Sequence, residues 1–175
     1  NMHTSQNISW EKVSADKKND AGVIAVNLPN RKTEYYKYTY NQPTDRKIYK
    51  TRQTNLSGDI DADFVHSSNV DSRGTYGDAI YNNGTIGNIT GDFIGNYASY
   101  YNSSSIAYYG GAIYNSGKIG NITGDFIGNF TDARYYKNSY IPTKGGAIYN
   151  DGTLGNITGN FIGNYASSSE ANGGA

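Results

Sequence analysis

The sequence predicts an all-β protein, a right-handed parallel β-helix (solenoid) in which each repeat forms one rung of three short strands. Three observations predict it. A 21-residue segment such as "GGAIYNSGKIGNITGDFIGNF" occurs three times with few changes. Gly recurs within each copy too often for a helix interior. The apolar content of 36% is low for one thick core, but is sufficient for a thin core shared along stacked repeats.

The repeats organise the chain from residue 55 to residue 175. The full copies follow one another at periods of 33 and 35 residues. They span 77–97, 110–130 and 145–165, with a degenerate copy at 58–67 and the opening of another, "NGGA", at 172–175. We therefore expect the array to continue beyond Ala175.

Each copy reads as short β-strands separated by turns. The runs "AIYN", "TIGNI" and "DFIGN" carry Ile, Tyr and Phe between Gly, Asn and Asp. One copy has too few apolar residues to fold alone, so its neighbours must complete its hydrogen bonds and cover its faces. Identical residues then lie above one another. This predicts a structural ladder made of Phe93, Phe126 and Phe161 and of Asn96, Asn129 and Asn164.

The segments between copies differ in length and composition. They run over 97–109, 130–144 and 165–172, so we expect them to leave the stack at one edge, where repeat proteins place their binding loops. Tyr gives large contact area at low entropy cost. The candidate binding residues are Tyr100, Tyr101, Tyr108, Tyr109, Tyr135, Tyr136 and Tyr140. The alternative is that these rings lie against the flank of the stack.

The segment 1–54 has no repeat and is predicted to be an N-terminal β cap that covers the open end of the stack. Strands are expected at 22–28, 34–40 and 46–50, with a turn between the first two. Trp10, the only Trp, either plugs the end of the stack or packs locally.

Composition excludes several classes of function. Lys plus Arg and Asp plus Glu are both 15, and no long basic run exists, which argues against nucleic acid and anionic membranes. There is no Cys, and no apolar stretch is long enough for a spanning helix. The first residue is Asn1, which suggests a removed leader or a trimmed terminus.

The search for catalytic chemistry finds one weak candidate. Asp63, Asp92 and Asp125 share one repeat position, and Asn160 completes the column. Such a column could bind a cation, with Asp92 and Asp125 as ligands, or serve a carbohydrate-active enzyme. Asp is also a common turn residue next to Gly, which explains the column more simply. We therefore expect no cofactor, no metal and no enzymatic activity.

The "GGAI" of residues 110–113 and 145–148, with the "FIGN" of 93–96, 126–129 and 161–164, resembles the two motifs of the chlamydial polymorphic membrane proteins. The first copy departs from this pattern, with Asp78 in place of the second Gly. The resemblance implies an autotransporter passenger, displayed outside the cell or on the bacterial outer surface for adhesion.

The sequence therefore favours an adhesin or self-association module. Its partner would be a host-surface protein, a glycan or another copy of itself. A polysaccharide lyase or hydrolase on the same fold is the alternative.

Overall fold

The structure is a computed structural model that describes residues 7–66, 68–69, 75–99, 108–132, 143–167 and 171–172. The chain is all-β, as expected. Its described residues form 24 strands, one short 3-10 helix at Ala15–Lys17 and no α-helix. Two compact units divide it, residues 1–45 and residues 46–175, and each is described by itself.

The first unit is a small antiparallel sheet with the strand order β1-β3-β2. Its strands are β1 (Ile8–Val13), β2 (Val23–Asn27) and β3 (Thr33–Tyr40). The 28–32 segment makes the expected turn between β2 and β3, with a backbone hydrogen bond from Leu28 to Lys32. Trp10 packs edge-on against Tyr38 with ring centroids 6.2 Å apart. This contact is the local packing that was one of the two predicted roles for Trp10.

The second unit contains all the repeats, and its strands are short. They are β4 (Lys47–Tyr49), β5 (Gly58–Val65), β6 (Ser68–Asn69), β7 (Thr75–Tyr76), β8 (Ile80–Asn82), β9 (Thr85–Thr90), β10 (Phe93–Ile94), β11 (Tyr97–Ser99), β12 (Tyr108–Tyr109), β13 (Ile113–Asn115), β14 (Lys118–Ile119), β15 (Ile122–Thr123), β16 (Phe126–Ile127), β17 (Phe130–Asp132), β18 (Thr143–Lys144), β19 (Ile148–Asn150), β20 (Thr153–Leu154), β21 (Ile157–Thr158), β22 (Phe161–Ile162), β23 (Tyr165–Ser167) and β24 (Ala171–Asn172).

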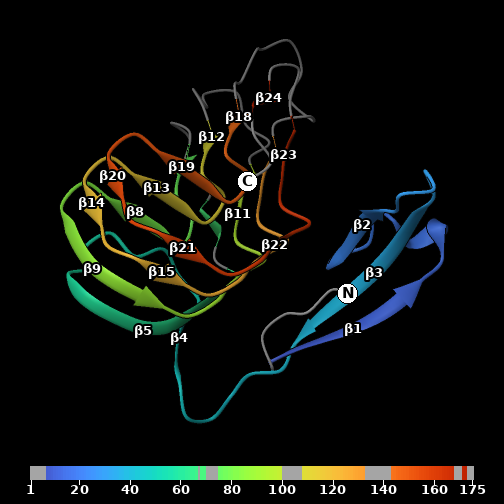
Figure 1. Ribbon diagram of the computed structural model, residues 1–175, viewed down its shortest axis with the longest axis horizontal. Helices are drawn as coiled ribbons and strands as arrows, with labels where there is room; N and C mark the ends of the chain where they lie inside the picture. Colours follow the sequence, from blue (N-terminus) through green and yellow to red (C-terminus); the bar gives the residue numbers. More distant parts are fainter. Residues whose placement is uncertain are drawn as a thin grey trace. The chain divides into compact units, whose positions relative to one another are not determined.

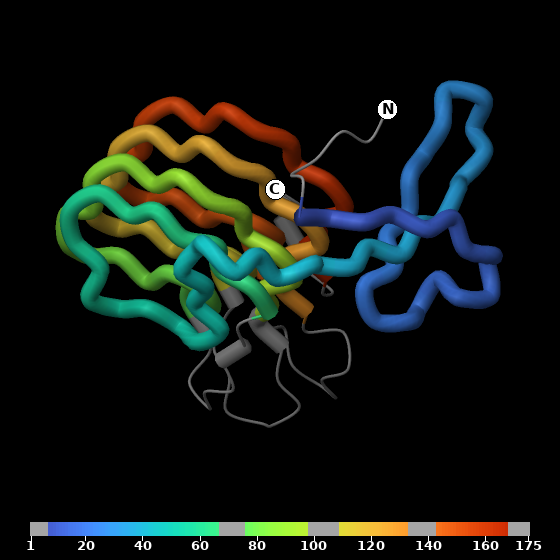
Figure 2. The backbone as a smooth tube through the Cα atoms, turned by 90° about the horizontal axis from the view of Figure 1, so that it is seen from below, coloured from blue at the N-terminus to red at the C-terminus, as the bar shows by residue number. Residues whose placement is uncertain are grey.

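Equivalent strands of successive copies pair in parallel and in register (Figure 1). Strand β13 lies between β8 and β19, so that Ile113 faces Ile80 on one side and Ile148 on the other. The strands that one copy contributes are here called a layer. Figure 2 shows the layers of the second unit as successive coils of the chain, one beside the next. All sheets of this unit are parallel.

Each layer holds more strands than the three expected. Between residues 108 and 132 the chain forms six short strands, β12 to β17. The backbone turns at Gly110 and Gly128 have positive φ angles of 72° and 64°, which Gly adopts without strain. These turns, together with the Asn and Ser positions, divide each copy into two- and three-residue strands.

The core consists of inward-facing columns that run across the layers. The rings of Phe64, Phe93, Phe126 and Phe161 stack nearly in parallel, with successive centroids 4.7, 4.5 and 4.8 Å apart. Ile89, Ile122 and Ile157 form a second column, and the first two are fully buried. The strict register of the repeat therefore does place like residue on like residue.

Two columns of Asn satisfy buried polar groups. Nδ2 of Asn96 donates to Oδ1 of Asn129 at 2.9 Å, and Nδ2 of Asn129 donates to Oδ1 of Asn164 at 2.8 Å. Asn82, Asn115 and Asn150 make a similar chain, with both links 2.8 Å long. These side chains join neighbouring layers through hydrogen bonds. The ladder of Asn96, Asn129 and Asn164 predicted from the sequence is thus present.

Residues 46–54 belong with the repeats, whereas the sequence suggested a boundary at residue 54. Strand β4 pairs with β5, and the ring of Tyr49 stacks on Phe64 at 5.2 Å. Gln53 forms a bridge with Ile80.

Candidate functional site

A ladder of tyrosine rings lines one flank of the second unit. In the "IYN" strands β8, β13 and β19, alternation turns Ile and Asn inward and Tyr outward. Tyr81 and Tyr114 stack with centroids 5.3 Å apart, and Tyr114 and Tyr149 follow at 5.5 Å. All three rings are half-buried. Because their faces cover one another, solvent reaches mainly their edges.

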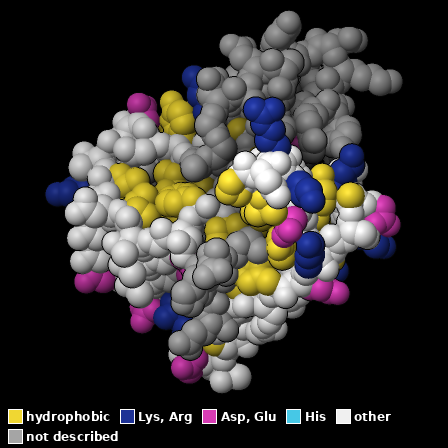
Figure 3. All heavy atoms as spheres, turned by 45° about the vertical axis from the view of Figure 1, so that its right-hand side comes forward, with side chains coloured by type: hydrophobic (Ala, Val, Ile, Leu, Met, Phe, Trp, Pro, Cys, Tyr) yellow, Lys and Arg dark blue, Asp and Glu magenta, His cyan; other side chains and the backbone are white. Residues whose placement is uncertain are grey.

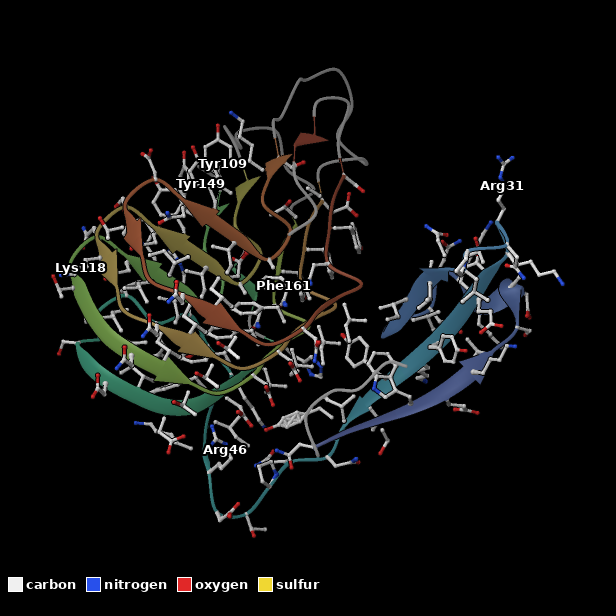
Figure 4. All side chains as sticks on the ribbon, viewed as in Figure 1. Arg31, Arg46, Tyr109, Lys118, Tyr149 and Phe161 are labelled. Carbon is white, nitrogen blue, oxygen red and sulfur yellow. The ribbon has the colours of Figure 1, made fainter. Side chains whose placement is uncertain are left out.

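Two further tyrosines extend this ladder. The ring of Tyr109 stacks on Tyr149 at 4.7 Å, and Figure 4 shows the two side by side. Tyr76 meets Tyr109 and Tyr114 edge-on, with centroids 5.3 and 5.0 Å away. We call Tyr76, Tyr81, Tyr109, Tyr114 and Tyr149 the tyrosine cluster. It combines side chains from two adjacent sheets into one continuous aromatic surface.

Two cations lie over rings of the tyrosine cluster. The guanidinium carbon of Arg52 is 5.1 Å from the centroid of Tyr81, and Nζ of Lys144 is 5.7 Å from that of Tyr109. Arg52 also donates hydrogen bonds to the backbone carbonyls of Tyr76 and Gly77. Cation–π contacts of this kind hold rings in place while leaving their edges accessible.

Two phenol groups of the cluster, those of Tyr76 and Tyr114, have raised pKa values. Burial, together with the neighbouring tyrosines, raises the pKa of Tyr76 above its ordinary value of 10.0. Burial and then the Asp151 carboxylate raise the pKa of Tyr114. Within the described residues, the hydroxyls of Tyr81, Tyr114 and Tyr149 make no hydrogen bond. They can therefore donate to or accept from a ligand.

The segments between copies begin and end next to one another. Strands β11, β17 and β23, which begin these segments, pair in register, and Ser99 lies opposite Asp132, which lies opposite Ser167. Strands β12 and β18, which end the first two segments, also pair, with Tyr109 opposite Lys144. The described ends of the first two segments therefore lie next to one another, and the end at β12 and β18 adjoins the tyrosine cluster.

The predicted binding residues have different outcomes. Tyr109 belongs to the tyrosine cluster, and Tyr108 lies in β12. Tyr100, Tyr101, Tyr135, Tyr136 and Tyr140 lie outside the described residues. Sequence reasoning passed over Tyr81, Tyr114 and Tyr149 because they sit inside the repeat. The signal was nevertheless present, since alternation in "IYN" puts Tyr outward whenever Ile is inward.

The aspartate column has a structural role. Oδ1 of Asp63 accepts the backbone N–H of Asp92 at 3.0 Å, and Oδ1 of Asp125 accepts that of Asn160 at 2.8 Å. Asp63 is 1% exposed and Asp125 is 8% exposed. Each carboxylate thus links its layer to the next one.

Arg46 closes the first end of this column (Figure 4). Its guanidinium contacts Asp63 at 3.1 Å and Asp61 at 2.7 Å, and it donates to the carbonyl of Thr90 at 3.1 Å. Burial acts against its charge, but the hydrogen bonds and charges of Asp63 and Asp61 raise the pKa of Arg46 overall. One cation therefore compensates the carboxylate at the end of the column.

Among the described residues, no group of three or more His, Cys, Asp or Glu side chains is arranged to hold a metal ion. No described helix has the length and apolar character needed to cross a membrane.

Comparisons with protein-family models, with curated proteins and with solved structures gave no significant match for this chain. The resemblance of the "GGAI" and "FIGN" motifs to the chlamydial polymorphic membrane proteins thus remains a prediction.

Proposed function

We propose that residues 46–175 form a right-handed parallel β-helix that serves as a binding module outside the cell or on a bacterial outer surface. The tyrosine cluster and the adjoining segments between copies form its recognition surface. The observation that carries this proposal is the stacked, half-buried row of Tyr81, Tyr114 and Tyr149 on the outer flank of the second unit.

The solenoid architecture is supported by the order of pairing. Every layer meets the next through the same strands, one repeat further along the chain, and the apolar columns continue from layer to layer. Connections between parallel strands of one sheet are right-handed in nearly all proteins, which favours the right-handed form. A stack of this kind presents long, regular flanks to solvent.

The chemistry of the flank suits a largely uncharged ligand. Phenol rings supply rigid contact area, and their hydroxyls supply hydrogen bonds at a low entropy cost. Around the tyrosine cluster both signs of charge occur, with Arg52 and Lys144 over its rings and Asp151 near Tyr114. Figure 3 shows acidic and basic side chains interspersed on the face that it draws. A glycan or a protein on a cell surface fits this chemistry, and the resemblance to adhesive passengers supports the same class of function.

The enzymatic alternative has less support. Its candidate residues, Asp92 and Asp125, both accept backbone N–H groups of the following layer through Oδ1. These hydrogen bonds explain the two carboxylates by a structural role, without a catalytic one. We therefore propose a binding protein and no hydrolase or lyase activity.

The proposal is tested by binding of the purified chain to cultured epithelial cells and to a glycan array. The main variant replaces Tyr81, Tyr114 and Tyr149 by Ser. A matched control replaces Thr90, Thr123 and Thr158, an exposed column on another sheet, by Ala. We expect the Tyr variant to lose at least about tenfold in affinity, as loss of aromatic anchors does, and the Thr variant to bind like the parent.

A third variant separates the flank from the loops. It replaces Tyr100, Tyr101, Tyr135 and Tyr136 by Ser and leaves the tyrosine cluster intact. Loss of binding in this variant alone would assign recognition to the loops. Unchanged binding in both Tyr variants, with circular dichroism like that of the parent, would refute the proposed surface.

A further inference from the structure

The tyrosine cluster presents its polar groups at a regular interval along the stack. Tyr81, Tyr114 and Tyr149 are in register in β8, β13 and β19. Their ring centroids follow one another at 5.3 and 5.5 Å, and successive rings are within 10° and 9° of parallel. The hydroxyls of parallel, stacked rings repeat at nearly the same interval as the rings. The outer side of the ladder is therefore a row of phenol hydroxyls, one in each layer.

A second row of hydrogen-bond donors runs beside the first. Tyr76 and Tyr109 are paired in register in β7 and β12, and Lys144 follows Tyr109 in β18. The ring of Tyr76 meets that of Tyr114 edge-on with centroids 5.0 Å apart, so the two rows are neighbours. Each layer thus adds a hydroxyl or an ammonium group next to the ladder. A ligand that lies along the stack meets hydrogen-bonding groups at every layer.

Stacking decides which part of each ring a ligand can reach. Tyr114 lies between the rings of Tyr81 and Tyr149, so neither of its faces is open. The guanidinium group of Arg52 lies over the ring of Tyr81. The accessible parts of the ladder are the ring edges and the hydroxyls. This arrangement favours a ligand that itself carries a row of hydrogen-bonding groups over one that stacks on an aromatic face.

The interval of the ladder argues against a polypeptide ligand. Side chains on one face of an extended strand recur at about 6.6 Å, so after two steps the strand would be out of register with the ladder by about 2 Å. An α-helix has a closer pitch of about 5.4 Å, but a helix that docks in this way buries an apolar face. The edges that the ladder offers carry hydroxyls. The row therefore suits a chain of hydroxyl-bearing units better than either form of polypeptide.

We propose that the tyrosine cluster binds a linear, uncharged β-1,4-linked glycan that lies along the stack, with one pyranose unit for each layer. This inference rests on the proposed function, because it names the ligand of the same surface. Equatorial linkages keep such a chain extended, and each unit advances by about the length of one sugar ring, close to the spacing of the layers. Its hydroxyls both donate to and accept from phenols. The mixed charge around the cluster, with Lys144 and Asp151, matches a neutral ligand.

Titration of the purified chain with cello-oligosaccharides of one to six units, followed by NMR, tests the proposal. Affinity should rise with each unit up to three, one for each of Tyr81, Tyr114 and Tyr149, and should change little beyond that. Malto-oligosaccharides are the matched control, because they contain the same glucose units in a curved, α-1,4-linked chain. They should bind at least about tenfold more weakly, since they cannot keep hydrogen bonds to successive layers. Equal binding of the two series, or an affinity that does not depend on length, would overturn the proposal.

A single substitution tests the hydroxyl row. Tyr114→Phe removes the central hydroxyl and keeps the ring between its neighbours, so it should weaken the binding of cellotriose about fivefold, as the loss of one hydrogen bond does. Tyr97→Phe is the control, because Tyr97 stacks on Phe130 in another sheet. It should bind like the parent. An unchanged affinity of Tyr114→Phe would mean that the hydroxyls are not the contact, against the proposal.

Cell binding distinguishes this inference from the proposed function. Suppose that replacing Tyr81, Tyr114 and Tyr149 by Ser abolishes cell binding, while cellohexaose does not compete with the parent for cells. The recognition surface would then stand and the glycan would be refuted as its ligand. Competition by an amphipathic helical peptide instead would assign a helical protein partner and would equally refute the glycan. If the Ser variant binds cells like the parent but no longer binds cellotriose, the glycan site stands and the proposed role in cell attachment fails.

Discussion

The carboxylate of Asp92 accepts a hydrogen bond from the backbone N–H of Asp125, 2.9 Å away and one repeat further along the chain. The same relationship joins Asp125 to Asn160. A side chain that could be read as a catalytic carboxylate thus serves as the backbone acceptor between layers. This contact explains why either Asp or Asn can stand in the column, since both provide the required oxygen.

Asp92→Ala should lower the free energy of unfolding by about 1–3 kcal/mol, because the N–H of Asp125 loses its acceptor. Asp92→Asn keeps an acceptor oxygen and should have a much smaller effect. Urea unfolding followed by circular dichroism compares the two. Equal losses for both variants would mean that the charge, and not the hydrogen bond, is what matters.

Phe126→Ala should destabilise the chain by about 3–5 kcal/mol, because the ring is fully buried between two others. Phe161→Ala, in the same column, should cost less, since that ring is 39% exposed. Guanidinium unfolding of both variants provides the comparison. A loss for Phe126→Ala no larger than that for Phe161→Ala would contradict the stacked core.

Gly124→Ala should be poorly tolerated, because a Cβ atom there would lie 1.7 Å from the carbonyl oxygen of Gly91 in the preceding layer. The backbone must shift to relieve this contact, at a cost of about 1–3 kcal/mol or more. Gly84→Ala is the matched control, because its nearest neighbour, Oδ1 of Asn82, would be 4.0 Å away. Thermal melting of the two variants should separate them clearly. Similar melting temperatures would show that the layers are not this closely spaced.

Tyr76 and Tyr114 should titrate at unusually high pH. The raised pKa values of Tyr76 and Tyr114 mean that the folded chain keeps protons that the unfolded chain releases near pH 10. Stability should therefore fall as the pH rises above about 10. The absorbance of tyrosinate measures the titration, and Asp151→Asn should lower the pKa of Tyr114. If Tyr114→Phe leaves the high-pH part of the titration unchanged, the pKa of Tyr114 is not raised by burial and by Asp151.

The repeat register made much of the second unit predictable. Copies of nearly constant spacing require Phe93 to meet Phe126, and Asn96 to meet Asn129, whatever the details of the turns. The number of strands in each copy could not be predicted from the sequence, because a Gly or Asn can either interrupt a strand or lie within it. Strand β4 was recognised, but its position beside β5 was not, since only Tyr49 corresponds to a residue of the repeat columns.

The candidate site was predicted only in part. Tyr109 was named from its place near a variable segment, while Tyr81 and Tyr114 were taken as parts of a structural strand. Alternation alone was enough to place them outward. The role of Asp92 could not be deduced in the same way, because its partner is a backbone N–H 33 residues away and no local motif marks it.

All of these predictions depend on the stacking of successive repeats, which pyrene fluorescence measures directly. Because the chain has no Cys, pyrene can be attached to Cys residues placed in pairs at Thr90, Thr123 and Thr158, an exposed column in which adjacent members are paired in register. The stacked layers predict strong excimer emission for Thr90 with Thr123 and for Thr123 with Thr158, and weak emission for Thr90 with Thr158. Equal emission from all three pairs, or none from the adjacent pairs in the folded chain, would contradict the stack.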